Sequence, residues 1–94
     1  TMDQKLVFRI HAIQRMFERG FTEEDVQSVV ETGENIEYYP YDSPYPSRLV
    51  LGWRGRNPVH IVVADNREEN EVIIITTYEP DKALWEPDFR RRKP

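Results

Sequence analysis

The amino-acid sequence predicts a single α+β domain in which two N-terminal helices pack on a mainly antiparallel, four-stranded sheet. Its 94 residues leave room for one hydrophobic core. Apolar residues recur with a helical period up to residue 33, and from there to residue 78 they alternate in short runs, as strands do. We therefore treat residues 1–94 as one domain with a charged C-terminal tail at 86–94, and interpret Thr1, which precedes Met2, as a vector remnant.

The first helix is predicted from Ile10, Ile13 and Phe17, which follow the 3.6-residue period and define the stripe that we expect to be buried. Gly20 is the expected stop. The second helix carries an N-terminal capping box, in which Thr22 caps and Asp25 reaches back. Its apolar stripe consists of Val26, Val29 and Val30, and we expect Gly33 to end it in a left-handed conformation.

The sheet is predicted from four short runs with a period of two. Residues 36–39 suit an edge strand that Pro40 ends, and a stiff loop rich in Tyr and Pro follows at 40–46. The other strands, 48–53, 59–65 and 71–78, are joined by short turns and should be antiparallel. Five-residue turns would place Gly52 opposite His60, and His60 opposite Thr76.

In that register each face of the sheet collects its own residues. The face expected against the helices reads Leu49, Leu51, Trp53, Val59, Ile61, Val63, Ile73, Ile75 and Thr77. The opposite, open face includes Val62 and Ile74 and is too apolar for an idle solvated surface. We expect either a partner or the C-terminal segment, through Leu84, Trp85 and Phe89, to cover it.

Charge and composition restrict the function. There are 17 acidic and 13 basic side chains, a net charge of −4, which argues against nucleic-acid binding through overall charge. The basic residues are segregated, with none from Gly20 to Ser47. No apolar run approaches the ~20 residues of a membrane span, so we expect a cytoplasmic protein without membrane contact. With no cysteine and two histidines, we expect no metal and no cofactor.

One cluster of residues on the open face suits metal-independent cleavage of RNA. The expected register places His60, Tyr78 and Arg54 at one end of that face, with Arg48 about 13 Å along it. Such cleavage needs a proton acceptor, a proton donor and positive charge at the phosphate. The structural alternative is that His60 bonds to Thr76, Tyr78 packs at the sheet end and both arginines are solvated. The residues alone favour this alternative.

Three further features have both a functional and a structural interpretation. His11, Arg15 and Arg19 recur every four residues on one side of the first helix, which suits phosphate binding or an ordinary solvated face. The Tyr-Pro loop suits stacking of unpaired bases or sealing of a core edge. The basic run at 90–93 suits phosphate contact or a solvated tail.

Several motifs resemble those of an uncharacterised bacterial domain-of-unknown-function family that opens with HAxxRMxERG and that we associate with RelE-like toxins. They are His11-Ala-Ile-Gln-Arg-Met-Phe-Glu-Arg-Gly20, Tyr39-Pro40, Pro46-Ser-Arg48, Leu51-Gly52, His60-Ile-Val-Val63 and Thr77-Tyr78-Glu79-Pro80. The order of parts is also similar to that of BrnT toxins, in which an Arg precedes an Ile-Gly or Leu-Gly strand and Gly-Arg forms the next turn. Here these places are occupied by Arg48, Leu51-Gly52 and Gly55-Arg56.

This resemblance implies a RelE-like fold and a toxin-like endoribonuclease that cleaves mRNA, paired with a protein antitoxin over the open sheet face. Under this interpretation the cluster derived above supplies the candidate catalytic residues His60, Tyr78 and Arg48. The candidate RNA-binding residues are Arg54 and, if the first helix borders the site, His11 and Arg15. The chain departs from RelE-like toxins in its acidic balance and in lacking a Lys-rich face. The alternative function is a non-catalytic protein-binding or homodimerisation module that depends on apolar residues such as Val62 and Ile74.

Overall fold

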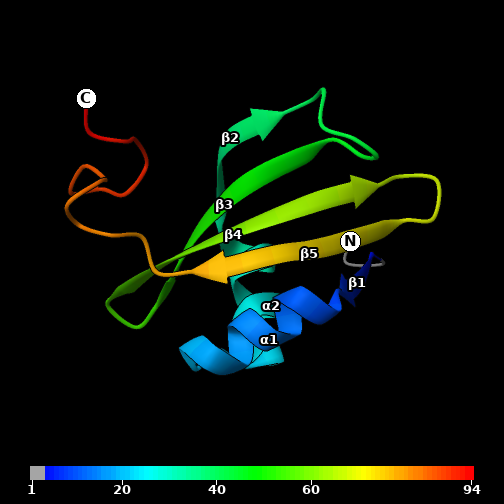
Figure 1. The fold of residues 1–94 in the computed structure, drawn as a ribbon, viewed down its shortest axis with the longest axis horizontal. Coiled ribbons are helices and arrows are strands. Elements are labelled where there is room, and N and C mark those ends of the chain that lie inside the picture. The colour runs from blue at the N-terminus through cyan, green and yellow to red at the C-terminus, as the bar shows by residue number, and fades with distance from the viewer. Residues whose placement is uncertain (1–3) are drawn as a thin grey trace.

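The computed structural model describes residues 4–94, so the interpretation of Thr1 lies outside the described residues. In chain order the elements are β1 (Lys5–Phe8), α1 (Ile10–Arg19), α2 (Glu23–Thr32), β2 (Glu34–Tyr39), β3 (Ser47–Arg54), β4 (Asn57–Asn66) and β5 (Glu71–Tyr78). They form one sheet in the order β1-β5-β4-β3-β2 with both helices on one side of it (Figure 1). The α+β class and the two helices are confirmed.

The sheet has five strands and is mixed, so the prediction of a four-stranded sheet is wrong. The additional strand, β1, is only four residues long and pairs in parallel with β5, from Lys5 opposite Glu71 to Phe8 opposite Ile74. A strand this short gives little alternation to detect, and its partner lies more than sixty residues away in the sequence.

Both helix ends at the α1–α2 connection form as expected. Gly20 is left-handed, with φ 75°, and donates to the carbonyls of Met16 and Phe17. The capping box of α2 is complete between Thr22 and Asp25. Gly33 differs from expectation because its backbone is extended, with φ −77° and ψ 179°. A Cβ there would lie 2.4 Å from the carbonyl oxygen of Val29, so close approach of the backbone, rather than handedness, requires glycine.

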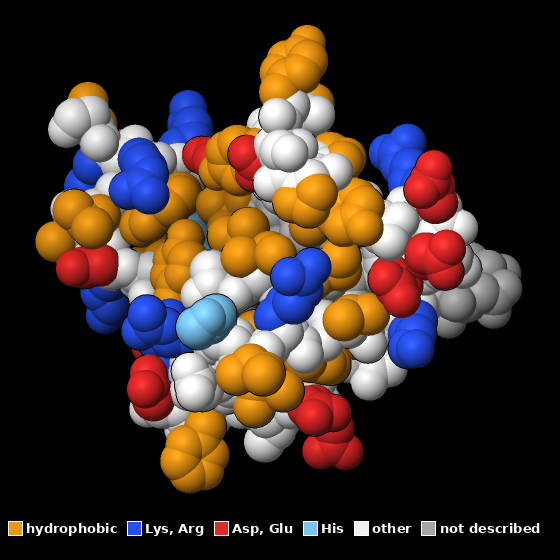
Figure 2. Space-filling view, turned by 45° about the vertical axis from the view of Figure 1, so that its right-hand side comes forward, with side chains coloured by type: hydrophobic (Ala, Val, Ile, Leu, Met, Phe, Trp, Pro, Cys, Tyr) orange, Lys and Arg blue, Asp and Glu red, His pale blue; other side chains and the backbone are white. Residues whose placement is uncertain are grey.

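The buried side of α1 is not the predicted one. Ala12 and Met16 face the sheet and are buried, whereas Ile10, Ile13 and Phe17 are 73%, 46% and 87% exposed. The small side chain of Ala12 lets the helix approach the sheet closely. At the helix end, the guanidinium of Arg19 donates to the Thr77 carbonyl at 2.7 Å, which helps to fix the rotation of the helix. Figure 2 shows hydrophobic side chains gathered on the surface of the molecule.

The register of β3 differs from the prediction by one residue. The β3–β4 connection is a two-residue turn, Gly55 and Arg56, and not a five-residue turn. Gly52 therefore opposes Val59, and His60 opposes Leu51. Because side chains alternate along a strand, this shift of one residue places every β3 side chain on the face opposite to the predicted one.

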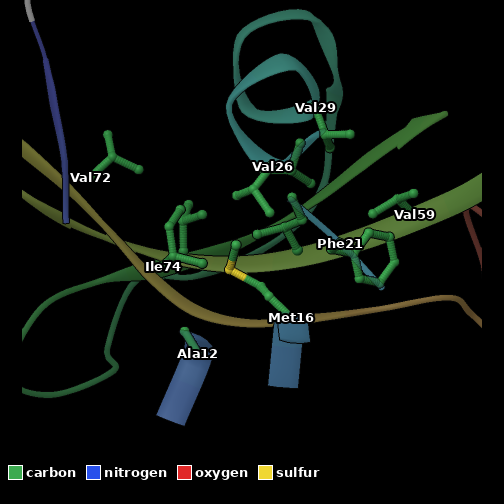
Figure 3. Close-up of a cluster of buried hydrophobic side chains, with 11 residues drawn as sticks. Ala12, Met16, Phe21, Val26, Val29, Val59, Val72 and Ile74 are labelled. Carbon is green, nitrogen blue, oxygen red and sulfur yellow. The ribbon is translucent and has the colours of Figure 1, made fainter. Parts of the chain in front are cut away.

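Two hydrophobic clusters follow from the observed register. The cluster between sheet and helices holds Ala12, Met16, Phe21, Val26, Val29, Val50, Val59, Ile61, Val63, Val72 and Ile74 (Figure 3). On the open face, Leu49 and Leu51 pack with Trp85 and Phe89 of the C-terminal segment. The assignment of Leu49, Leu51, Trp53, Ile73 and Ile75 to the helix side is therefore wrong for β3 and the first part of β5. Coverage of the open face by the C-terminal segment is confirmed for Trp85 and Phe89, while Leu84 remains 53% exposed.

Candidate functional site

The structure brings His60 and Tyr78 together on the open face. They are paired residues of β4 and β5, the Nδ1 of His60 lies 3.3 Å from the Tyr78 hydroxyl, and their rings meet edge to face at 5.4 Å. Thr76 opposes Val62, so the expected His60–Thr76 pair does not form. The β4–β5 connection has four residues and not five, which shifts the register by one residue, and a bulge between Val62 and Val63 shifts it by one more.

Arg48 does not join this pair. It opposes Val63, a residue that packs beneath the helices, so it lies on the face of the sheet away from His60. Its guanidinium donates to Asp65 at 2.9 Å and to the Asn35 side chain at 2.8 Å. The prediction that Arg48 shares the open face with His60 is wrong because of the register of β3.

We expect Arg48 to be a structural residue, so Arg48→Ala should destabilise the fold by about 1.5–3 kcal/mol, the usual range for hydrogen bonds to charged groups. The reason is that both members of the Arg48–Asp65 pair are mostly buried, with side-chain exposures of 16% and 19%. Urea unfolding measures the change. Lys5→Ala, at an exposed position, is the control and should change stability little; equal stabilities of the two variants would contradict the assignment.

Arg54, His11 and Arg15 also lie away from the His60–Tyr78 pair. The guanidinium of Arg54 donates to the Gly20 carbonyl at 2.8 Å and to Asp25 at 3.3 Å, which ties the β3–β4 hairpin to the helix connection. His11 and Arg15 are exposed on α1, on the helix side of the sheet. The three residues therefore do not converge on one phosphate with His60.

His60 is held in one tautomer by its surroundings. It is 0% exposed, and its Nε2 lies 2.9 Å from the carbonyl oxygen of Phe89. A carbonyl only accepts hydrogen bonds, so we assign the proton to Nε2 and leave Nδ1 as an acceptor for the Tyr78 hydroxyl. Burial lowers the pKa of His60, against opposing effects of the Phe89 hydrogen bond and the charge of Glu37. The ring is therefore neutral at pH 7.

The lowered pKa of His60 predicts a pH dependence of stability. In the unfolded chain a histidine has a pKa of about 6.5. Between that value and the lower folded pKa, the unfolded state binds more protons, so stability falls as the pH drops below about 6.5. Urea unfolding from pH 8 to pH 5 should show this loss, and His60→Gln should flatten it. An unchanged slope in the variant would contradict it. The pKa of Asp25 is lowered mainly by the Thr22 backbone hydrogen bond. Its protonation therefore reduces stability only in a separate pH range, below about 4.

Three residues that the sequence interpretation did not place with His60 and Tyr78 complete the cluster: Glu37, Tyr39 and Arg92. Glu37 and Tyr39 oppose Leu49 and Ser47 of β3, which places both on the open face. The Tyr39 hydroxyl donates to the Glu37 carboxylate, and burial together with this bond raises the pKa of Tyr39 to about 12. Their two-residue spacing in a strand was a signal for a shared face. Arg92 was considered only as part of the basic run at 90–93, and its place beside His60 depends on how the chain end folds back.

The cluster shares one electrostatic environment. Burial raises the pKa of Tyr78, while the charge of Arg92 lowers it and that of Glu37 raises it. The charges of Arg92 and Glu37 also act on His60 and on Tyr39. Tyr78 is therefore protonated at neutral pH, donates to His60, and lies within the field of one carboxylate and one guanidinium.

The C-terminal segment brings basic residues to this face. Trp85 is almost fully buried, and the Arg92 guanidinium lies 4.9 Å from the centre of its ring. Arg90 pairs with Glu34 of β2 at 2.9 Å. The Lys93 amide bonds back to the Leu84 carbonyl. The run at 90–93 is therefore held against the domain by these contacts, and Arg92 brings positive charge to the cluster.

Two classes of site find no support among residues 4–94. The described His, Asp and Glu residues include no group of three or more placed to hold a metal ion. In the same part of the chain, no helix is both long and apolar enough to span a membrane.

Fold and cluster together define a small α+β protein with a tyrosine–histidine pair on the open face of a five-stranded sheet. Residues 8–79 match the family described as Domain of unknown function (DUF4258), and the chain belongs to this family. The predicted membership of an uncharacterised domain family is thus confirmed. Neither the curated proteins nor the solved structures gave a significant match. The relation to RelE and BrnT toxins stays a prediction.

Proposed function

We propose that the protein is a toxin-like, metal-independent endoribonuclease. Its active site is the open-face cluster, which consists of Glu37, Tyr39, His60, Tyr78 and Arg92. The observation that carries the proposal is the Tyr78 hydroxyl bonded to a buried, neutral His60 in the field of Glu37 and Arg92. Burial lowers the pKa of His60 and raises that of Tyr78, and perturbed pKa values beside a specific charge partner are typical of functional sites. Arg48 and Arg54 have structural partners, so Arg92 replaces them as the phosphate-binding residue.

The cluster has the groups that RNA cleavage needs. The 2′-oxygen of a ribose attacks the adjacent phosphorus, the bond from phosphorus to the 5′-oxygen breaks, and a 2′,3′-cyclic phosphate forms. Tyr78 takes the 2′-hydroxyl proton while its own proton passes to Nδ1 of His60. Tyr39, protonated because its pKa is about 12, supplies a proton to the leaving 5′-oxygen. Arg92 stabilises the charge on the phosphate.

Cleavage-site mapping in a translating extract tests the proposal. The purified protein is treated with EDTA, incubated with a messenger RNA, and the cut positions are compared with those of Arg92→Ala and Arg56→Ala. Both variants lose one exposed arginine, but Arg56 lies in the β3–β4 turn. We expect cuts with the native chain and with Arg56→Ala and a strong loss with Arg92→Ala. Intact RNA at high protein concentration would overturn the proposal.

A second candidate function is the non-catalytic protein-binding or dimerisation module. The exposed stripe of Ile10, Ile13 and Phe17 favours it, because their spacing is that of helix anchors in a partner's groove. Ile74 cannot contact a partner, since it is fully buried beneath the helices, so the predicted dependence on Ile74 is wrong for binding. In this second candidate function, the exposed stripe on α1 binds the partner, and the open face of the sheet does not.

The dimerisation form of this candidate predicts a large effect of Phe17→Glu on assembly. Phe17 is 87% exposed, so the variant should keep its stability within about 0.5 kcal/mol, as surface changes usually do. In sedimentation equilibrium, the native chain should dimerise and the variant should be a monomer. Gln14→Glu adds the same charge to α1 and leaves the apolar stripe intact. A native chain that stays monomeric at high concentration would exclude the homodimer.

A further inference from the structure

A small cavity lies beside the cluster on the open face. Its volume is about 200 Å³, and Val62, Ala64 and Ile75 form its apolar floor. Pro44 and Tyr45 line it from the Tyr-Pro loop. Arg9, Asp42, Ser43 and Ser47 supply its polar lining.

The cavity adjoins the proposed catalytic residues. Val62 follows His60 by two residues on the same side of β4, a rise of about 7 Å. Ser47 opposes Tyr39 in the β2–β3 pairing, and the Asp42 amide donates to the Tyr39 carbonyl at 3.2 Å. A group bound in the cavity would therefore lie next to the phosphate that the cluster cleaves.

The volume and the lining of this cavity suit a ligand with one planar six-membered ring. An engineered cavity of about 150 Å³ is known to hold benzene, so about 200 Å³ suits a single-ring base better than a two-ring one. The Tyr45 ring is held in place because its hydroxyl accepts from the Asn66 side-chain amide at 3.2 Å. Such a fixed aromatic ring next to an apolar floor favours stacking of an unpaired base.

The polar groups select among pyrimidines. The Ser47 hydroxyl donates to one Asp42 oxygen, which orients the carboxylate. A carboxylate has about four lone-pair positions, so that of Asp42 has capacity to accept from a further donor. Cytosine offers its N4 amino group as a donor, whereas uracil presents the O4 acceptor in its place. Arg9 adds a positive charge at the same cavity, which offsets the repulsion between Asp42 and a phosphate.

We infer that this cavity binds a cytosine base of the RNA, adjacent to the cleaved bond, with Asp42 accepting from N4 and Tyr45 stacking on the ring. The inference rests on the proposed endoribonuclease function and gives its substrate preference.

Binding of RNA that cannot be cleaved tests the inference separately from catalysis. The probes are two 2′-O-methyl tetranucleotides that differ only in carrying C or U at one position, titrated calorimetrically. We expect the native protein to bind the C-containing probe about 10-fold more tightly, which corresponds to one discriminating base contact of about 1.4 kcal/mol. Asp42→Asn should bring the ratio close to one, while Glu24→Gln, on the exposed side of α2, should leave it unchanged.

Ile75→Trp is a second variant, which fills the cavity from a position that is 42% exposed and should therefore leave the fold intact. It should weaken binding of the C-containing probe to the level of the U-containing probe. Equal affinity of the native chain for both probes, no binding of either, or a C preference that survives both Asp42→Asn and Ile75→Trp would overturn the inference. Cleavage without a preference for C would overturn the cytosine-binding inference but not the endoribonuclease function. A preference for C without cleavage would overturn the endoribonuclease function but not the cytosine-binding inference.

Discussion

Replacing Tyr78 by Phe is expected to lower the rate of RNA cleavage by about 10²- to 10⁴-fold, the usual contribution of a positioned proton-transfer group. The substitution removes only the hydroxyl that donates to His60 and keeps the ring that packs edge to face against the imidazole. The cost in stability should be small, about 1 kcal/mol for one lost hydrogen bond. Single-turnover cleavage of a mapped RNA substrate, compared with urea unfolding, separates the two effects.

Tyr41→Phe is the matched control for Tyr78→Phe. It makes the same chemical change at a side chain that is 96% exposed, and it should leave cleavage unchanged. Retained cleavage in Tyr78→Phe would remove this residue from the mechanism and leave His60 as a structural histidine. Equal losses in both variants would indicate that the effect is not specific to the proposed site.

Local signals in the sequence predicted the helix boundaries well. The capping box of α2 depends on Thr22 and Asp25, which are three residues apart, so the information is contained in one turn of helix. The same holds for the left-handed end of α1 at Gly20. The face that α1 buries was not predictable in this way, since Ile10, Ile13 and Phe17 are more apolar than the Ala12 that contacts the sheet. Tertiary packing, and not residue hydrophobicity, determines that face.

The positions of other site residues could not be predicted from local signals, because they depend on how strands pair and on how the chain end folds back. The length of the turn at Gly55 and Arg56 sets which β3 residues face the helices, and a shift of one residue moved Arg48 to the other side of the sheet. The pair of His60 and Tyr78 was predicted on one face because the shorter β4–β5 turn and the bulge each shift the register by one residue, and two such shifts restore the face. The position of Arg92 beside this pair was not predicted, since it requires the chain to fold back over Trp85.

The burial of Trp85 predicts a large loss of stability in Trp85→Ala, about 3–5 kcal/mol, as for other large-to-small changes in cores. Trp85 is 3% exposed, packs with Leu49 and Leu51, and meets the His60 ring edge to face at 4.4 Å. Since small domains have a total stability of about 5–15 kcal/mol, this is a large fraction. Urea unfolding measures it, and Leu84→Ala, at the neighbouring exposed position, should cost far less.

The same variant tests whether the C-terminal segment builds the active site. Without the Trp85 ring, the Arg92 guanidinium loses its contact, and the Phe89 carbonyl no longer has a fixed segment to hold it against His60. Under conditions where Trp85→Ala is still folded, cleavage should therefore fall as it does in Arg92→Ala, and the pKa of His60 should rise because the ring is no longer buried. Full cleavage by folded Trp85→Ala would mean that the segment only covers the sheet and that the phosphate is bound by other residues.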